Sequence, residues 1–332
     1  MGSCNSAKKL NIDFPALEED GFSVRTQGQD LFICGGKRKG TLFGVYDFLE
    51  QVGCRKYSPD AELIPKKKLL RIPQYNITEI PVFQYRETLM PDASDPDYAE
   101  WHKLNHRSER EKDWGMWVHT FDNLIPPEKY FNEHPEYFSL NNGVRSSKTQ
   151  LCLSNPNVLD LVILHLKELI SKNPLANHWS ISQNDTYGPC ECSGCENIDN
   201  QYGGVPSGSI IHFVNQVAER FPNKVISTLA YQYSRKAPEG IKPAENVNIV
   251  LCTIELNRSK PIKTDPSSRG FVNDISNWKK LTNNILIWDY IVQFRNYLDP
   301  FPNLHVLQPN IQFFSDSGVQ MMFEQGTNRS LS

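Results

Sequence analysis

The sequence has no excess of basic residues and no long apolar run. Its 332 residues include 35 Lys and Arg against 38 Asp and Glu, which gives a formal net charge of −3. A protein that binds nucleic acid through its phosphates needs a basic surface, so this composition argues against a nucleic-acid partner. No apolar run approaches the roughly 18–20 residues that cross a bilayer, so we expect no membrane span.

Several short motifs that define large enzyme classes are missing as well. The chain contains no phosphate-binding loop, no dinucleotide-binding fingerprint and no HExxH sequence. It also has no internal repeat and no low-complexity tract. These absences remove the function classes that the motifs and repeats define.

Cysteine is too sparse to build a disulfide scaffold. Hydrophobic residues make up 39% of the chain, so a large core forms without covalent cross-links. Cysteine usage alone therefore leaves the compartment open. The eight cysteines stand at positions 4, 34, 54, 152, 190, 192, 195 and 252.

The N-terminus lacks the basic and apolar segments of an intact signal peptide. Gly2, Ser3 and Cys4 nevertheless resemble the end of a bacterial lipobox, within a polar tether at residues 1–9. A lipoprotein with a lipid anchor at Cys4 would lie in the periplasm or at the cell surface of a Gram-negative bacterium. A chance cysteine near the start of the chain is the alternative, and the sequence leaves both open.

Residues 10–74 have the pattern of a small, partial α/β domain. Polarity alternates as in paired strands, and then apolar side chains recur at helical spacing. The expected elements are strands at 22–26, 30–34 and 69–74, a helix at 39–53 and a proline-containing linker at 73–81.

After the linker, short apolar runs alternate with amphipathic helices. The runs do not alternate in polarity, as expected of strands buried on both faces of a parallel sheet. The runs lie at 82–89, 115–121, 150–154, 178–184, 224–233, 247–255, 284–290 and 319–325, with helices expected at 155–173, 207–221 and 271–284. This order predicts a (β/α)8 TIM barrel over residues 80–332, truncated at its C-terminus because no closing helix follows.

Ionisable residues end several of these runs, where a barrel holds its active site. Asp289 and Glu324 directly follow bulky apolar residues, and Asp185 follows the run at 178–184. Three carboxylates at one rim suit glycoside hydrolysis, in which one protonated carboxyl donates to the leaving oxygen and another stabilises the oxocarbenium-like centre or activates water. Loop capping by Asp185 and structural ion pairs at the other two are the alternative.

The stretch CECSGC places Cys190, Cys192 and Cys195 within six positions. Zinc takes about four ligands, and Cys152, at a neighbouring strand end, is the candidate for the fourth. Two CxxC pairs would be a stronger signal than this spacing. A structural zinc ion, a disulfide and unbridged thiols all stay open, and the sequence requires no cofactor.

Longer stretches resemble known families. The segment KGTLFGVYDFLEQVGCRKYSPDAELIPK resembles the end of the small domain that precedes the barrel in β-N-acetylhexosaminidases (family 20 glycosidases) and α-glucuronidases. Stretches such as NDTYGPCECSGC, LAYQYSRKAP and IWDYIVQFRNYLDPFPNL are similar to the bacterial family filed as domain of unknown function 4838. These resemblances imply a barrel of the glycosidase kind.

The hexosaminidase resemblance implies roles for particular positions. Its first-strand arginine matches Arg86, and its seventh-strand aspartate and eighth-strand glutamate match Asp289 and Glu324. Its Asp-Glu pair after the fourth strand is replaced by Asn184 and Asp185. This departure argues against a mechanism assisted by the substrate's acetamido group, while an acid at Asp185 is retained.

The leading hypothesis is a glycoside hydrolase that cleaves O-glycosidic bonds of a complex glycan. Asp185 is the expected acid, and Asp289 and Glu324 are the expected base or stabilisers. The expected substrate contacts are Arg86, His119, Asn184, Tyr231 and Tyr290. The alternative is a non-catalytic glycan-binding lipoprotein with a degenerate site, which Asn184 in place of a carboxylate favours.

Overall fold

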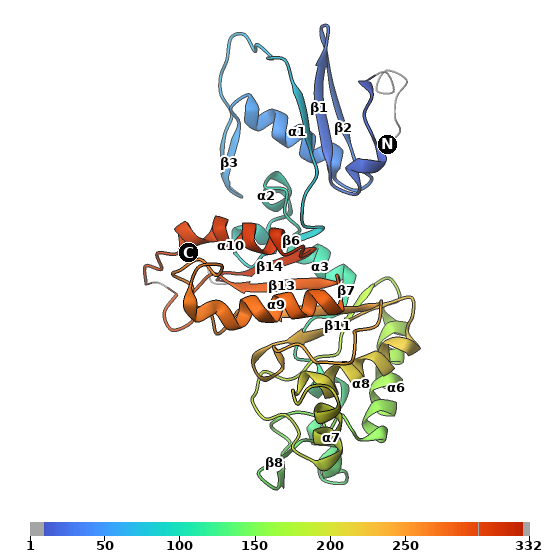
Figure 1. Ribbon diagram of the computed structural model, residues 1–332. Helices are drawn as coiled ribbons and strands as arrows, with labels where there is room; N and C mark the ends of the chain where they lie inside the picture. The colour runs from blue at the N-terminus through green and yellow to red at the C-terminus, as the bar shows by residue number, and fades with distance from the viewer. Residues whose placement is uncertain (1–9, 298, 328–332) are drawn as a thin grey trace. The chain divides into compact units, whose positions relative to one another are not determined.

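The computed structural model describes residues 10–297 and 299–327 (Figure 1). The predicted tether at 1–9, with Cys4, lies outside the described residues. Within the described ranges, no helix has the length and apolar character needed to cross a membrane.

Two compact units make up the described chain. The first contains the described residues up to Ser108 together with Thr327, and the second contains Glu109–Gly326. The division lies further along the chain than the linker expected at 73–81. Strand β6 (Tyr85–Thr88), which the sequence assigns to the barrel, therefore belongs to the first unit.

A three-stranded antiparallel sheet organises the first unit. Its strands are β1 (Phe22–Gln27), β2 (Asp30–Gly35) and β5 (Asn76–Glu79), in the order β2-β1-β5. Helix α1 (Gly40–Gln51) packs on the sheet and places Phe43 in one cluster with Phe22. Gly44 permits this close approach, because a Cβ there would lie 2.7 Å from the Ile33 side chain. The first two predicted strands and the predicted helix are confirmed.

The third predicted strand of this unit, at 69–74, is wrong. Leu69 and Leu70 are 68% and 47% exposed, and the segment forms no strand. β5 pairs with β1 instead, because its Ile77 packs on the apolar cluster of the sheet. The other elements of this unit are β3 (Arg55–Ser58), β4 (Ala61–Leu63), α2 (Pro96–Trp101) and 3-10 turns at Pro15–Leu17 and Asp92–Ser94.

Six strands of a parallel sheet lie in the second unit. They are β7 (Trp114–Met116), β10 (His178–Ser180), β11 (Val225–Ala230), β12 (Val247–Cys252), β13 (Ile285–Tyr290) and β14 (Met321–Gln325), hydrogen-bonded in the order β14-β13-β12-β11-β10-β7. Every residue of β12 and β13 is buried, as expected of strands covered on both faces. The carboxyl ends of parallel strands meet at one edge, so the residues that follow them gather there.

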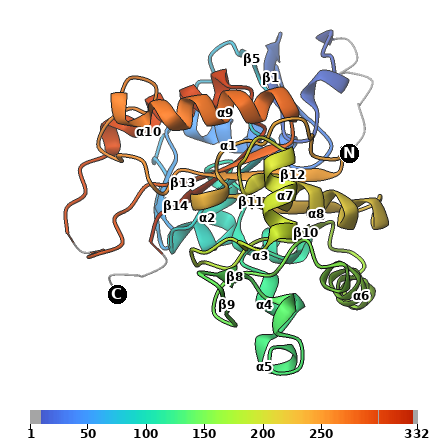
Figure 2. The same ribbon diagram turned by 60° about the horizontal axis from the view of Figure 1, so that its bottom comes forward.

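The predicted (β/α)8 barrel is found in part, as a curled parallel sheet that does not close across the described residues. Residues 150–154 form no strand, because Leu151 makes an isolated antiparallel bridge to Phe138 and the Cys152 N–H donates to Tyr137 O. β7 pairs with β10 and, across residues 10–297 and 299–327, with no second strand. The protein therefore has a curled, open α/β sheet of the TIM-barrel kind (Figure 2).

Helices cover this sheet, and the three predicted ones are confirmed. α8 (Ser207–Arg220) packs against β11 and β12. α9 (Arg269–Leu281) meets α10 (Leu304–Asp316) through the rings of Phe271 and Phe314. α6 (Pro156–Lys172) is capped by Asn155, whose side chain accepts from the Asn157 N–H.

The sequence did not predict α10, nor α7 (Ser193–Gln201) after the cysteine-rich loop. The remaining short elements are α3 (Arg107–Asp113), α4 (Phe121–Leu124), α5 (Pro127–Tyr130), β8 (Leu140–Asn141), β9 (Val144–Arg145) and 3-10 turns at Pro135–Tyr137, Gln232–Ser234 and Pro266–Ser268.

Candidate functional site

The strand register divides the predicted site residues between the two faces of the sheet. Cys252 pairs with Trp288, and Trp288 pairs with Phe323, so these three side chains share one face. Asp289 and Glu324 pair one residue further along. Because successive residues of a strand point to opposite faces, these two carboxyl groups lie on the other face.

The face of Trp288 and Phe323 is the concave one. Trp117, which follows β7, stacks on Trp288 of β13 with 5.4 Å between ring centroids, although three strands separate β7 from β13. Trp117 also packs edge-on against Phe323 of β14. Contacts between strands that are not neighbours form across the inside of a curled sheet. Sequence reasoning missed this aromatic wall, whose signal was a tryptophan at or near a strand end.

Asp185 follows β10 and is exposed to solvent. Its Oδ1 accepts a hydrogen bond from the Tyr231 hydroxyl at 3.0 Å, and Gln232 Nε2 donates to that hydroxyl at 3.0 Å. Burial and the Asp185 charge raise the pKa of Tyr231, which therefore stays a neutral donor. His119, with Nδ1 2.8 Å from Gln183 O, packs edge-on against the Tyr231 ring. Asp185, Tyr231 and His119 thus form one group.

Tyr290 belongs to the same neighbourhood. Its side chain is buried, and burial raises the pKa of its hydroxyl. The negative charge of Asp185 raises this pKa further. Tyr290 stands two residues beyond Trp288 on β13, so it points to the same concave face, and the two ring centroids are 6.2 Å apart.

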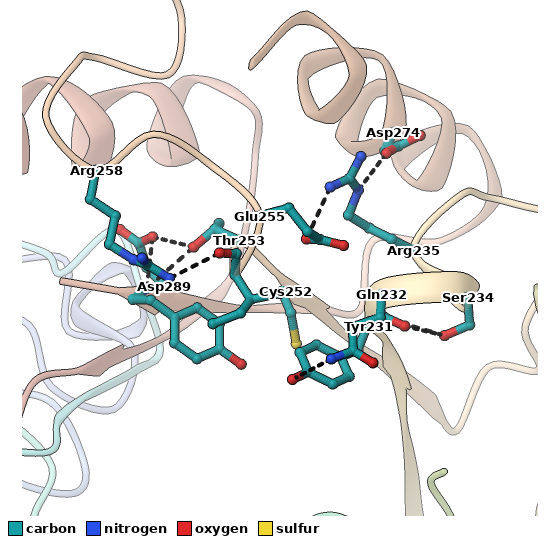
Figure 3. Close-up of polar contacts among 12 residues, drawn as sticks. Tyr231, Gln232, Ser234, Arg235, Cys252, Thr253, Glu255, Arg258, Asp274 and Asp289 are labelled. Carbon is teal, nitrogen blue, oxygen red and sulfur yellow. Dashed lines mark hydrogen bonds and ion pairs between the residues drawn. The ribbon is translucent and has the colours of Figure 1, made fainter. Parts of the chain in front are cut away.

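Glu255 is a second carboxylate at this rim. Its Oε2 lies 3.0 Å from Arg235 Nη1, and Arg235 Nε donates to Asp274 at 2.8 Å (Figure 3). Burial raises the pKa of Tyr231 and Cys252, and the Glu255 charge adds to both shifts. Glu255 stands three residues beyond Cys252, the last residue of β12, whose side chain lies on the concave face. Its signal in the sequence was its place just beyond the end of β12.

Asp289 and Glu324 form a different kind of pair. Asp289 is buried, and its Oδ1 accepts from the Thr253 hydroxyl and from the Tyr290 N–H, the latter at 3.0 Å. Glu324 Oε2 is buried and has no hydrogen-bond partner among the described residues. The two carboxyl groups are paired on adjacent strands, but only Asp289 has hydrogen-bond donors around it. The Thr253 hydroxyl was not predicted as part of this group from the sequence.

Burial raises the pKa of both members of this pair. For Asp289, the Thr253 hydroxyl, the Tyr290 N–H and the charge of Arg258 oppose that effect. For Glu324, burial and the Asp289 charge act in the same direction and hold its pKa well above the ordinary value of 4.5. Two adjacent buried carboxyl groups do not both ionise, so Asp289 is better placed to carry the charge and Glu324 to keep a proton.

The surroundings of Asp289 are closed. A cavity of about 10 Å³ lies against it, lined also by Arg258 and by Val306 and Asn310 of α10, and holds about one water molecule. The Arg258 guanidinium lies 5.6 Å from the centroid of the Tyr290 ring. This side of the sheet is therefore covered by α10 and offers no room for a sugar ring at the described cavity.

Two predicted substrate contacts are engaged elsewhere. Asn184 is buried, and its amide donates to Asp122 at 2.8 Å and to Thr149 O at 2.7 Å. Arg86 lies in the first unit, where its guanidinium donates to Asp20 at 3.0 Å. Contacts of Asn184 and Arg86 with a glycan stay predictions.

The structure thus sorts the predicted residues into groups. Asp185, His119, Tyr231 and Tyr290 share the concave rim, whereas Asp289 and Glu324 point to the opposite face. A separate group contains the four cysteines that were the metal candidates: Cys152, Cys190, Cys192 and Cys195 have Sγ atoms that all lie within 4.8 Å of one another. These thiols are placed to hold a metal ion.

Comparisons with known proteins give a family match. The family profile described as Domain of unknown function (DUF4838) matches residues 56–331. No curated protein matches the chain.

Two solved structures show distant similarity. One is a family 18 glycoside hydrolase, a chitinase from Pseudoalteromonas aurantia, at 12% identity and a TM-score of 0.30, covering 53% of this chain and 63% of that one. The other is a family 138 glycoside hydrolase that targets pectin rhamnogalacturonan II, at 9% identity and a TM-score of 0.32, covering 95% of this chain and 41% of that one. The chain thus spans less than two thirds of either. TM-scores of this size establish no common fold, so the functional argument rests on the residues of the site.

Proposed function

The chain belongs to the DUF4838 family, and we propose that it is a glycoside hydrolase whose active site is the concave rim of the parallel sheet. One observation carries the proposal: Asp185 Oδ1 accepts from the Tyr231 hydroxyl at 3.0 Å at the strand-end rim that also bears the Glu255 carboxylate, on the side of the sheet where Trp117 packs on Trp288. Most glycoside hydrolases cleave the glycosidic bond with a pair of carboxyl groups, and an aromatic side chain nearby can pack on the sugar.

Asp185 serves as the acid in this proposal. The Asp185 proton passes to the leaving glycosidic oxygen as the bond from that oxygen to the anomeric carbon breaks. Water forms the new bond to the anomeric carbon and gives a proton to Glu255, and solvent exchange returns the starting protonation states.

The groups around the carboxylates hold them and the sugar in place. The Tyr231 hydroxyl, fixed by Gln232, donates to Asp185 and limits where its carboxyl points. Arg235 Nη1 pairs with Glu255 Oε2 at 3.0 Å and limits where that carboxylate points. Trp117 is half-buried and stacks on the buried Trp288, so it supplies the apolar aromatic side chain against which a sugar would pack.

Asp289 and Glu324 have a structural role in this proposal. They lie on the face that α10 covers, so their predicted part as base or stabilisers gives way to Glu255. The register supports this assignment because it separates them from Asp185.

The test is a hydrolysis screen on the full chain with aryl glycosides and complex glycans, run beside Asp185→Asn. Asp185→Asn keeps the size and the hydrogen bond of the side chain but cannot donate an acidic proton. We expect product from the wild-type chain and a loss of about 10²–10⁴-fold in the variant.

Glu245→Gln is the matched control. Glu245 is exposed and precedes β12, at the opposite edge of the sheet. Its substitution should leave the rate unchanged. Equal activity of Asp185→Asn and the wild-type chain would contradict the proposed acid.

A glycan-binding protein without turnover is the second candidate. Asn184 favours it, because this residue stands where the hexosaminidase pattern has a carboxylate and its amide is bound to Asp122 and Thr149 O. Binding of a glycan by calorimetry, with no product from that glycan in long incubations, would support this function over hydrolysis.

A further inference from the structure

Four thiols from two separated segments meet in one buried place. Cys152 stands before α6, while Cys190, Cys192 and Cys195 come from the loop before α7 and its first turn. Cys152, Cys190 and Cys195 are buried, and Cys192 packs against them. Buried thiols that are drawn together from distant segments need an explanation beyond apolar packing, since a small apolar side chain would fill the same space.

The spacing of the sulfurs suits a single metal ion. Zinc lies about 2.3 Å from each thiolate, so four sulfurs at the corners of a tetrahedron are about 3.8 Å apart. Here Cys152 Sγ and Cys192 Sγ are 3.5 Å apart, and all four Sγ atoms lie within 4.8 Å of one another. An iron–sulfur cluster, which places several atoms between its thiolates, would hold the sulfurs further apart.

Polar groups around the sulfurs point to thiolates. The Leu140 N–H donates to Cys190 Sγ at 3.4 Å, and Arg145 Nη1 donates to the same sulfur at 3.7 Å. Ser154 Oγ lies 3.3 Å from Cys195 Sγ and 3.4 Å from Cys192 Sγ. N–H donors such as those of Leu140 and Arg145 commonly orient the sulfur ligands of a metal site.

The backbone is also shaped for this arrangement. Gly194 stands between two of the cysteines, and a Cβ there would lie 2.5 Å from Ser154 Oγ. Glu191, also between two cysteines, donates its N–H to Leu140 O at 2.8 Å, and its carboxylate accepts from the Asn142 N–H at 2.7 Å. The β8–β9 hairpin is thereby tied to the cysteine loop.

We propose that Cys152, Cys190, Cys192 and Cys195 bind one structural zinc ion in a closed tetrahedral site. Binding releases the four thiol protons and leaves a site with two net negative charges, which Arg145 partly offsets. All four ligands come from protein, so no position is open for substrate or water. The zinc ion would fasten the β8–β9 hairpin and the start of α6 to the loop that begins after Asp185.

The first test is metal analysis of the full chain, purified without chelator. We expect one zinc ion per chain by mass spectrometry under native conditions and by elemental analysis. Cobalt added to the zinc-free chain should produce the intense thiolate-to-cobalt absorption and the visible bands of a tetrahedral site. These readouts need no substrate and do not depend on the proposed hydrolase activity.

Variants identify the ligands. Cys152→Ser and Cys195→Ser should lose zinc on dialysis against a chelator that leaves the wild-type chain loaded. Cys54→Ser is the matched control, because Cys54 lies in the first unit as a free thiol outside this group. It should keep one zinc ion per chain.

Three results would overturn the proposal. The first is a wild-type chain without bound metal whose four thiols react freely in the native state. The second is a mass lower by two hydrogens for each disulfide among these cysteines. The third is stoichiometric iron in place of zinc. Because all three are read on the wild-type chain, a variant that fails to fold does not leave the question open.

Discussion

The two carboxyl pairs of the second unit lie at or after the carboxyl ends of strands of the same sheet, but they differ in exposure, in hydrogen-bond partners and in the face to which they point. Asp185 and Glu255 lie at the concave rim, the first exposed beside a tyrosine hydroxyl and the second paired with an arginine. Asp289 and Glu324 point to the other face, where Asp289 lines a cavity of about 10 Å³ beside α10. A position at a strand end is therefore not enough to make a carboxylate catalytic. The face to which it points decides what it can reach.

The second pair shows what burial does to crowded acids. Asp289 keeps three groups that stabilise its charge, while Glu324 is held neutral by burial and by Asp289. The four cysteines present the same problem with twice as many groups. One retained proton removes the charge repulsion between two adjacent carboxyl groups. Four adjacent thiolates repel one another more strongly, and a bound cation would offset that repulsion.

The largest effect that separates the two pairs is on the rate. Glu255→Gln removes the carboxylate that takes a proton from water, so we expect kcat to fall by about 10²–10³-fold. Glu324→Gln should leave kcat within about threefold, because Glu324 faces away from the concave rim. Rates on one glycoside, measured beside circular dichroism of each variant, check this. Equal losses in both variants would remove the distinction between the pairs.

The next effect is on stability and has the opposite pattern. Asp289→Ala leaves the Thr253 hydroxyl without its buried acceptor and leaves the Tyr290 N–H with only Thr253 Oγ1 at 3.2 Å, which should cost about 1–3 kcal/mol of unfolding free energy. Asp185→Ala, at an exposed position, should cost less than about 0.5 kcal/mol. Urea unfolding of both variants gives the comparison. A larger loss in Asp185→Ala would contradict it.

The pH dependence of stability sharpens the same contrast. The unfolded chain releases the Glu324 proton near its ordinary pKa of 4.5, whereas the folded chain keeps it to a higher pH. Between these values the folded state binds more protons, so the unfolding free energy falls as pH rises, by up to about 1.4 kcal/mol per pH unit.

Glu324→Gln has no proton to lose, so its stability should change less between pH 4.5 and 8 than that of the wild-type chain. Unfolding curves at intervals across this range measure both slopes. Parallel slopes would show that Glu324 titrates alike in the folded and unfolded states.

The smallest expected effect is at the tyrosine that orients Asp185. Tyr231→Phe removes one hydrogen bond to the carboxylate, worth about 0.5–1.5 kcal/mol, so kcat/KM should fall by about 2–10-fold. Tyr297→Phe, at a half-buried tyrosine in the loop after β13, is the comparison variant and should show no change. A tyrosine that only fills space would give the same small effect at both positions.

Much of the fold could be predicted from the sequence because its signals are local. The runs at 247–255 and 284–290 are apolar without alternation and become strands buried on both faces. Asn155 before a long amphipathic run marks the start of α6. The run at 150–154 also contains apolar residues, yet it forms no strand of the sheet. Its backbone pairs with Tyr137 and Phe138 instead, and no local sequence pattern predicts that pairing.

The site was predicted less completely, for a physical reason. Reading strand ends gave Asp185, and the alternation of side chains separates Trp288 from Asp289. Which of the two faces is concave depends on contacts such as Trp117 on Trp288, between strands far apart in the sheet. For the same reason Glu255 was passed over. Cys152 was named as the candidate fourth ligand, and the structure places its Sγ with the other three.

The most direct test of the central claim is one set of hydrolysis rates on a single glycoside, taken from four variants of the full chain. Asp185→Asn and Glu255→Gln change the concave rim, and Asp289→Asn and Glu324→Gln change the opposite face. We expect the first two to lose at least about 100-fold in kcat/KM and the last two to stay within about threefold of the wild-type chain. Loss of activity in Asp289→Asn and Glu324→Gln, with Asp185→Asn and Glu255→Gln still active, would place the chemistry on the other face and contradict an active site at the concave rim.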